Sequence, residues 1–369
     1  MSLLPEFFLA ARTVRLPDRE IIEAVVDPVH AGPSPALARL LQSWPGPVYW
    51  ADEADGRRLV LIRPLPRARR ERWGVHALLA AATLITTMMA GAVLAGTWPY
   101  LGSLTDWLTL HGFDHLLPGW AYAVPLMAIL LAHELGHYVA ARRYAIDVSP
   151  PYFIPAPMYP FLIGTLGAFI RLRSPPADRR QLFDVALAGP VAGLIVALPV
   201  LAIGLGLSHP LPAPLPHGMY AQFGGYTLVL GDSVATMVLR TLFGPGGGTG
   251  LALELHPVAF AGWLGLLVTM FNLLPMGQLD GGHIVYAALR RWHRTVAMSV
   301  WVGLVVLSYW WAGWAFWAVV VFLVSRGQFI HPSVVDVYRP LPASRGWLAV
   351  IALLLFALTF APIPLGVIE

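Results

Sequence analysis

The sequence has no cysteine and no lysine among its 369 residues, and Asn272 is its only asparagine. Without cysteine there is no disulfide framework, no thiolate metal site and no cysteine nucleophile, so any metal must be held by His, Asp or Glu. Charged residues make up 12% of the chain, roughly half the share of a soluble globular domain. Together with a hydrophobic share of 57%, this scarcity excludes an intrinsically disordered chain and favours an integral membrane protein.

The net charge of +4, carried by 24 arginines, would by itself suggest a nucleic-acid partner. The arginines lie beside the apolar segments, however, as membrane topology signals do, and we expect no nucleic-acid partner. Arginines are frequent before residue 75 and in 142–182, and scarce in 98–118 and 207–256. The positive-inside rule then places the N-terminus and residues 143–182 in the cytosol. The sequence predicts a multi-pass protein of the cell (inner) membrane, and its all-arginine usage indicates a bacterial genome.

Six apolar segments approach or exceed the roughly 20 residues that a transmembrane helix needs: 75–97, 119–142, 183–206, 257–275, 295–325 and 346–364. The fifth would be about 46 Å long as one helix, which is too long for one upright span. Its aromatic centre, Tyr309 to Trp314, predicts an interfacial turn between two short spans. We therefore expect an all-α polytopic membrane protein with six to seven spans, seven being favoured.

Residues 1–73 are the only long stretch of ordinary soluble composition. Residues 48–64 alternate, turn at Asp55–Gly56 and alternate again, which predicts a β-hairpin, and the segment around 18–43 is a candidate helix. We expect a small cytosolic α/β domain over 1–73, followed by a membrane-embedded domain over 74–369. Residues 207–256 show no series of strands and are interpreted as external, with 221–243 interfacial or partly inserted.

The second apolar segment contains His133-Glu134-Leu135-Gly136-His137. Residues four apart share one face of a helix, so both imidazoles can bind one cation, and Glu134 can act as general base toward a catalytic water. His133 lies nine residues before Arg142, roughly 13 Å inside the membrane boundary. Ionisable residues at that depth indicate function, the alternative being a trio of groups that hydrogen-bond between helices.

A catalytic zinc needs a third protein ligand, and the extended soluble motif HExxHxxGxxH fails because residue 143 is an arginine. The best candidate is Asp280, in a segment of helix-breaking residues: Pro275, Gly277, Gly281 and Gly282. The helix is expected to unwind there, and irregular backbone at membrane depth persists only when it is buried in protein or lines a wet cavity. A carboxylate at such a break can turn towards the histidine pair.

Two more polar residues flank Asp280. The Asn272 amide either hydrogen-bonds between helices or grips an extended substrate backbone. His283 is a candidate transition-state donor or a partner of the metal site, the alternative being a histidine that is satisfied locally.

HExxH in one span with NxxPxxxLDGG in a later one resembles the site-2 protease family of intramembrane zinc metalloproteases. Gly164-Thr-Leu-Gly167-Ala-Phe-Ile170 resembles the family's re-entrant β-loop, and Ala188-Gly189-Pro190-Val-Ala-Gly193 resembles a small-residue motif of its third core helix. The resemblance covers roughly 119–290, leaves 295–364 as extra C-terminal spans, and includes neither a PDZ nor a CBS module. It implies one zinc per chain, with the ligands His133, His137 and Asp280 and with Glu134 as catalytic base.

The predicted function is hydrolysis of a peptide bond within or near a transmembrane segment of another membrane protein, in regulated signalling. The expected partners are that substrate and the lipid bilayer. Substrate contact is predicted for five residues: Asn272, Pro275, His283, Gly164 and Gly167. Because a helical substrate hides its carbonyls, it must unwind, and the 150–172 loop can hold it extended through an edge strand. The alternatives are a transporter that moves Zn²⁺ with the same ligands, for which Glu134 is unnecessary, and a catalytically silent scaffold.

Overall fold

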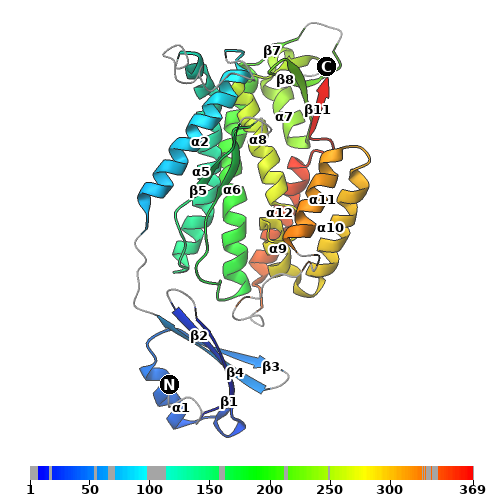
Figure 1. Ribbon diagram of the computed structural model, residues 1–369. Coiled ribbons are helices and arrows are strands. Elements are labelled where there is room, and N and C mark those ends of the chain that lie inside the picture. The colour runs from blue at the N-terminus through cyan, green and yellow to red at the C-terminus, as the bar shows by residue number, and fades with distance from the viewer. Residues whose placement is uncertain are drawn as a thin grey trace.

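The fold is mostly helical, with a small sheet at each end of a helical bundle (Figure 1). The computed structural model describes residues 7–15, 19–53, 56–64, 71–97, 114–157, 163–211, 215–247, 250–325, 327, 329, 334 and 340–368. In this part of the chain, three helical segments are long and apolar enough to cross a membrane. They contain α2 (Trp73–Leu94), α5 (Trp120–Arg143) and α6 (Arg179–Gly206). The other apolar segments form shorter helices, so the expected count of six to seven spans stays a prediction.

The N-terminal sheet is antiparallel, in the order β1-β2-β4-β3. Its elements are β1 (Phe8–Arg15), β2 (Arg19–Val26), α1 (Pro35–Ser43), β3 (Val48–Glu53) and β4 (Gly56–Pro64). The predicted hairpin is confirmed by the pairing of β3 with β4, although residues 54–55 of its turn lie outside the described residues. The predicted helix over 18–43 is largely wrong. Alternate residues of 19–26 are buried in the pattern of a strand, and the helix begins only after Ser34, whose hydroxyl accepts from Leu37 N–H.

The centre of the bundle is built by α5, α6 and α8 (Pro257–Asn272), which pack against one another, while α2 packs on α5. Small residues allow the close approach of these helices, as is typical of helix pairs in membranes. A Cβ added at Gly136 of α5 would lie 2.3 Å from the Ala188 carbonyl oxygen of α6. A Cβ at Gly262 of α8 would lie 2.5 Å from Leu201 N, so α6 is held between its two neighbours at backbone distance.

The long fifth apolar segment divides as predicted, into α10 (His293–Leu307) and α11 (Ala312–Val324). The break falls at 308–311, slightly before the centre of the aromatic cluster. Trp314 belongs to α11 and is fully buried, with its indole N–H donating to the Pro362 carbonyl at 2.7 Å. The last apolar segment is α12 (Ala343–Thr359).

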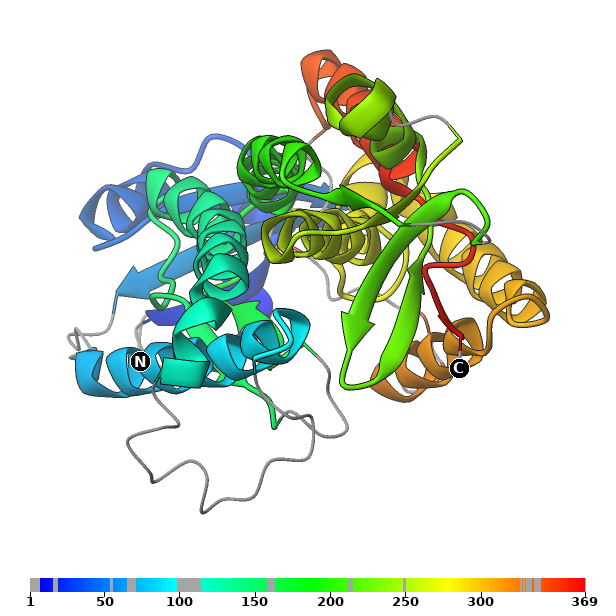
Figure 2. The same ribbon diagram turned by 90° about the horizontal axis from the view of Figure 1, so that it is seen from above.

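A five-stranded sheet lies at the end of the bundle opposite the N-terminal sheet (Figures 1 and 2). Its order is β11-β9-β8-β10-β7, from β7 (His209–Pro210), β8 (Gly218–Phe223), β9 (Tyr226–Leu230), β10 (Ala252–Glu254) and β11 (Leu365–Ile368). The expectation of no strand series in 207–256 is therefore wrong, and so is the description all-α. Segment 221–243 is the end of a hairpin followed by α7 (Val234–Phe243).

A missed local signal and a nonlocal one explain this error. Gly224 and Gly225, both with positive φ, connect Phe223 to Tyr226 in a two-residue hairpin turn, which the sequence displays between two apolar runs. The remaining strands are two to four residues long and pair with partners far along the chain, so local periodicity carries little trace of them.

A separate hairpin follows α5 and consists of β5 (Tyr152–Pro155) and β6 (Thr165–Phe169). It is fastened to the bundle at its far end, where the Thr86 hydroxyl donates to Gly164 O at 2.6 Å and the Tyr122 hydroxyl donates to Ile163 O at 2.9 Å. Residues 158–162 between the strands lie outside the described residues. The segment that resembled a β-loop is thus a hairpin packed against α2 and α5.

Candidate metal centre

Helix α5 presents His133, Glu134 and His137 to the interior of the bundle, where all three are buried. The helix is continuous through this turn, so the four-residue spacing places both imidazoles on one face. Their Nε2 atoms lie 3.1 Å apart. The geometry that the spacing predicts is therefore present.

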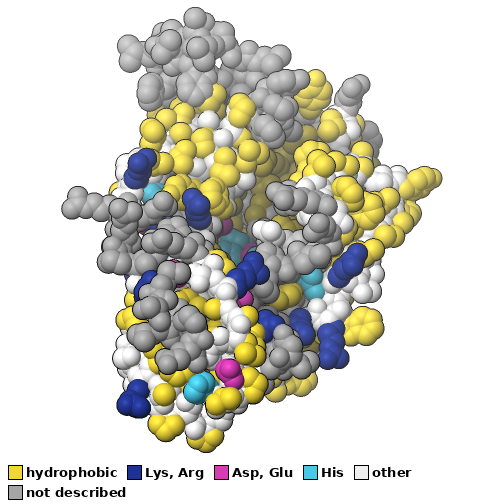
Figure 3. Space-filling view, turned by 60° about the horizontal axis from the view of Figure 1, so that its bottom comes forward, with side chains coloured by type: hydrophobic (Ala, Val, Ile, Leu, Met, Phe, Trp, Pro, Cys, Tyr) yellow, Lys and Arg dark blue, Asp and Glu magenta, His cyan; other side chains and the backbone are white. Residues whose placement is uncertain are grey.

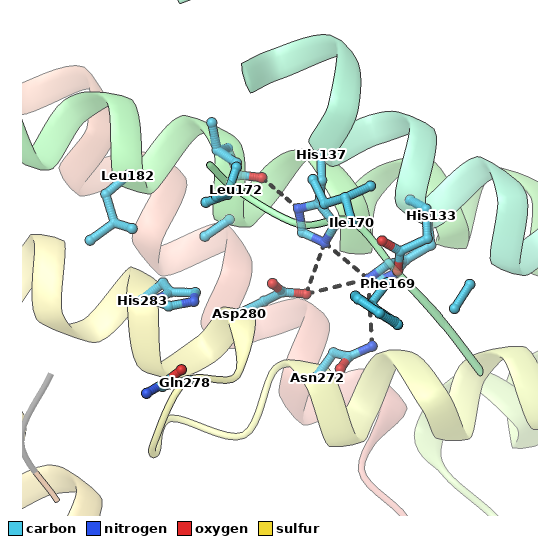
Figure 4. A pocket seen from close by; sticks show the side chains of 14 residues that line it. His133, His137, Phe169, Ile170, Leu172, Leu182, Asn272, Gln278, Asp280 and His283 are labelled. Carbon is cyan, nitrogen blue, oxygen red and sulfur yellow. Dashed lines mark hydrogen bonds and ion pairs between the residues drawn. The ribbon is translucent and has the colours of Figure 1, made fainter. Parts of the chain in front are cut away.

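The third residue comes from a break between α8 and α9 (Asp280–Leu289), which confirms the predicted unwinding. The chain folds back tightly here, because a Cβ at Gly281 would lie 2.1 Å from the Leu273 carbonyl oxygen, and Gly277 has a φ of 60°. Asp280 is the first residue of α9. Its Oδ2 lies 3.4 Å from His133 Nε2 and 3.3 Å from His137 Nε2 (Figure 4).

These three atoms fit a tetrahedral metal ion. Zinc ligands at about 2.0–2.1 Å in tetrahedral geometry lie roughly 3.3 Å from one another, close to all three observed separations. His137 Nδ1 lies 2.8 Å from the Val185 carbonyl, which can only accept, so Nδ1 carries the proton and Nε2 offers its lone pair. In the described part of the chain, this is the one cluster of three His, Asp or Glu side chains that can hold a metal.

Helix α6 provides the space for the two imidazoles. A Cβ at Gly189 would lie 2.1 Å from His137 Nε2, and one at Gly193 would lie 3.3 Å from His133 Nδ1. The small-residue motif over 188–193 was noticed in the sequence, but its contact with the histidines was not. The Val185 carbonyl was missed as well, since a backbone acceptor leaves no signal in residue type.

A cavity of about 250 Å³ opens beside the three side chains. One wall is apolar and comes from the segment after α5 and from α6, including Ala168, Phe169, Ile170, Leu172, Leu182 and Val185. The other wall is polar and comes from the α8–α9 break. The Ile170 backbone lies close to the Glu134 carboxylate, so the apolar wall adjoins the candidate base. Figure 3 shows a central hollow containing histidine and acidic side chains, with apolar surface and arginines around it.

The predicted substrate-contact residues divide into two groups. Asn272 and His283 line the cavity, and Asn272 Nδ2 lies 3.5 Å from His133 Nε2 (Figure 4). Pro275 lies in the break and Gly167 in β6, both outside the lining. Gly164 packs on α2, where a Cβ would lie 2.4 Å from the Thr86 carbonyl oxygen. Gln278 also lines the cavity and was missed, because nothing distinguishes it from a surface glutamine in the sequence.

Comparisons with known proteins agree with this geometry. The model of the family described as Peptidase family M50 matches residues 121–309. "Probable zinc metalloprotease EGY1, chloroplastic" of Arabidopsis thaliana is 38% identical over 170 residues, 46% of this chain and 29% of the relative. "Probable zinc metalloprotease EGY2, chloroplastic" of the same plant is 31% identical over 244 residues, 63% of this chain and 40% of the relative.

The matches thus span less than half the length of these curated relatives. No solved structure matches the chain. The family description covers half of the chain, including both motifs, and the resemblance read from the sequence is confirmed. The chain belongs to Peptidase family M50, the site-2 protease family.

Proposed function

We propose that the protein is a zinc-dependent intramembrane protease that hydrolyses a peptide bond within or beside a transmembrane segment of another membrane protein, in regulated signalling. The observation that carries this proposal is the convergence of His133, His137 and Asp280 on one point inside an apolar bundle, with Glu134 beside them and a cavity in front. Ionisable side chains at that depth are costly, and their cluster is expected to serve chemistry.

A zinc ion bound by these three residues would supply Lewis-acid activation of water and polarisation of the scissile carbonyl. Glu134 acts as the base: its carboxylate accepts a proton from the attacking water and delivers it to the leaving amine. Glu134 lines the cavity, and its carboxylate lies close to the Ile170 backbone. The open side of the metal cluster thus faces the space in which a peptide would lie.

The hairpin offers a way to hold the substrate extended. In the described residues β6 pairs with β5 alone, so its other edge is open for an added strand. On the opposite wall, Asn272 is placed to hydrogen-bond the peptide backbone and His283 to stabilise charge on the scissile carbonyl oxygen. Pro275 shapes the break that presents them, while Gly164 and Gly167 act through the shape of the hairpin.

We further propose seven spans, a re-entrant placement of the β5–β6 hairpin, and the division into a cytosolic domain over 1–73 and a protease domain over 74–369. The arginine distribution supports a site near the cytosolic face of a bacterial inner membrane. Because the chain has no cysteine, single cysteines test this orientation. Arg143→Cys and His217→Cys both replace exposed residues. We expect impermeant thiol reagents to label only the second in intact cells; labelling of the first alone contradicts the orientation.

Reconstitution of the purified protein in vesicles distinguishes a protease function from a transporter function. Purified protein in vesicles with a single-span substrate should release two fragments, and Glu134→Gln should abolish the release. The same vesicles should show no ⁶⁵Zn flux above that of protein-free vesicles. Flux that survives Glu134→Gln, without cleavage in the wild type, would establish the transporter.

A further inference from the structure

An ion pair between Arg173 and Glu71 connects the apolar wall of the cavity to the start of α2. Arg173 follows the lining residue Leu172 directly, and Glu71 lies two residues before α2. The guanidinium makes two parallel hydrogen bonds to the Glu71 carboxylate, one of them 2.9 Å long, and its Nη1 lies 3.6 Å from Asp147. Such bidentate pairs combine strength with a fixed geometry.

A second connection runs through three rings. His76 on α2 hydrogen-bonds through Nδ1 to the Pro151 carbonyl at 3.0 Å, and its ring lies 4.1 Å from that of Tyr152 in β5. The Tyr152 ring stacks at 5.4 Å on Phe169, which lines the cavity. Contacts from His76 on α2 and from Glu71 just before α2 therefore reach this wall at both ends of the segment 169–173.

The environment of these side chains favours a durable connection. The His76, Arg173 and Glu71 side chains are only 7%, 13% and 21% exposed, so water screens the charges less than at an open surface. The hydrogen bonds from Arg173 lower the pKa of Glu71, which keeps the carboxylate charged at neutral pH. In addition, Arg173 N–H donates to the Asp147 carbonyl at 2.8 Å, which fixes the backbone next to the pair.

We propose that Glu71, His76 and Arg173 are positioning residues: they hold segment 168–172 against α2 and thereby set the distance between the open edge of β6 and the metal cluster. The inference rests on the proposed function, because the positioned edge is the one that receives the substrate. It gives the N-terminal end of α2, which carries no metal ligand, a part in substrate binding beside that of Asn272 and His283.

The first test is kinetic. Glu71→Gln and Arg173→Gln should each raise KM for a single-span substrate roughly tenfold, which is the change expected when one charge-assisted hydrogen bond is lost. The kcat and the zinc content should stay nearly unchanged. The double variant should be no worse than the worse single, because both changes remove the same pair. Glu20→Gln is the matched control: it removes the pair with Arg63 in the N-terminal sheet and should leave KM unchanged. Effects of the two single changes that multiply, or a fall in kcat alone, would overturn the proposal.

The second test does not depend on activity. Hydrogen exchange of the 168–172 amides should speed up several-fold in Glu71→Gln and in His76→Ala, and less in His76→Phe, which keeps a ring against Tyr152. Exchange in 133–137 should stay as in the wild type. Unchanged exchange at 168–172 would refute the positioning role even if the protein cleaved normally. Faster exchange in a protein that cleaves nothing would sustain the positioning and reject the proposed protease.

Discussion

The two elements that supply the metal cluster are built in opposite ways. Helix α5 is unbroken, and regular geometry alone brings His133 and His137 together. Asp280 comes from an interruption, where the chain leaves α8 at Asn272 and resumes as α9 only at residue 280. In α5, helix geometry alone brings two of the three donor atoms together. The break between α8 and α9 has no such regular geometry, so the position of Asp280 depends on the helices packed around it.

Helix α6 joins these two elements. It packs on α5, on α8 and on α9, and it contacts the histidines through Gly189, Gly193 and the Val185 carbonyl. The motif on α5 thus supplies ligands, while α6, which carries no ligand, sets the relative position of the two halves of the cluster.

We expect the largest effect from replacing a metal ligand, whether the ligand lies on α5 or at the α8–α9 break. We expect His137→Ala and Asp280→Ala to reduce bound zinc from one ion per chain to nearly none and to abolish cleavage, because two protein ligands hold zinc poorly. His283→Ala is the control, since it changes a neighbour on α9 that is no member of the cluster, and it should keep its zinc. Elemental analysis of purified protein decides; full zinc in Asp280→Ala would remove the break from the site.

The second-largest effect is expected from adding a methyl group to a glycine of α6. Gly189→Ala would place a carbon 2.1 Å from His137 Nε2, so we expect a loss of about 1–3 kcal/mol in stability and weaker zinc binding. Gly193→Ala meets His133 at 3.3 Å and should cost much less. Thermal unfolding and zinc titration of both variants measure the difference, and equal behaviour of the two would show that α6 does not set the position of His137.

The break should tolerate a backbone change less well than a regular helix. Gly277→Ala forces an L-residue to a φ of 60°, at a cost of about 1 kcal/mol, although the nearest contact of the added Cβ among the described residues is Val321 Cγ1 at 3.8 Å. Gly303→Ala in α10 has open space and should stabilise slightly. Unfolding in detergent compares the pair; a harmless Gly277→Ala would mean that the break is not fixed by its backbone.

The smallest effect on stability is expected at the end of α8. If the Asn272 amide hydrogen-bonds to the substrate backbone and so grips it, Asn272→Ala should lower turnover and leave zinc content and melting temperature nearly unchanged. If it hydrogen-bonds between helices instead, the variant should lose about 0.6 kcal/mol of stability. Its position on the cavity wall favours the first outcome. A lower melting temperature with intact activity per folded molecule would reject the grip.

The same contrast explains how far the sequence could be interpreted. The HExxH motif, the division of 295–325, the β3–β4 hairpin and the break before Asp280 follow from local periodicity or from glycine and proline. The five-stranded sheet depends on pairing of β11 with β9 across more than a hundred residues, which local pattern does not encode. The role of α6 was hidden for a similar reason, because a glycine that makes room for a histidine resembles any other small residue until the helices are packed.

The most direct test of the account is the variant Glu134→Gln, assayed for zinc and for cleavage on one preparation. Glutamine keeps the size of the side chain but is not basic enough to accept the proton of water. We predict one zinc per chain, an unchanged melting temperature and no detectable fragments of a single-span substrate that the wild type cleaves. Cleavage by Glu134→Gln at a rate near that of the wild type would contradict the assignment of the base and, with it, the proposed chemistry of the site.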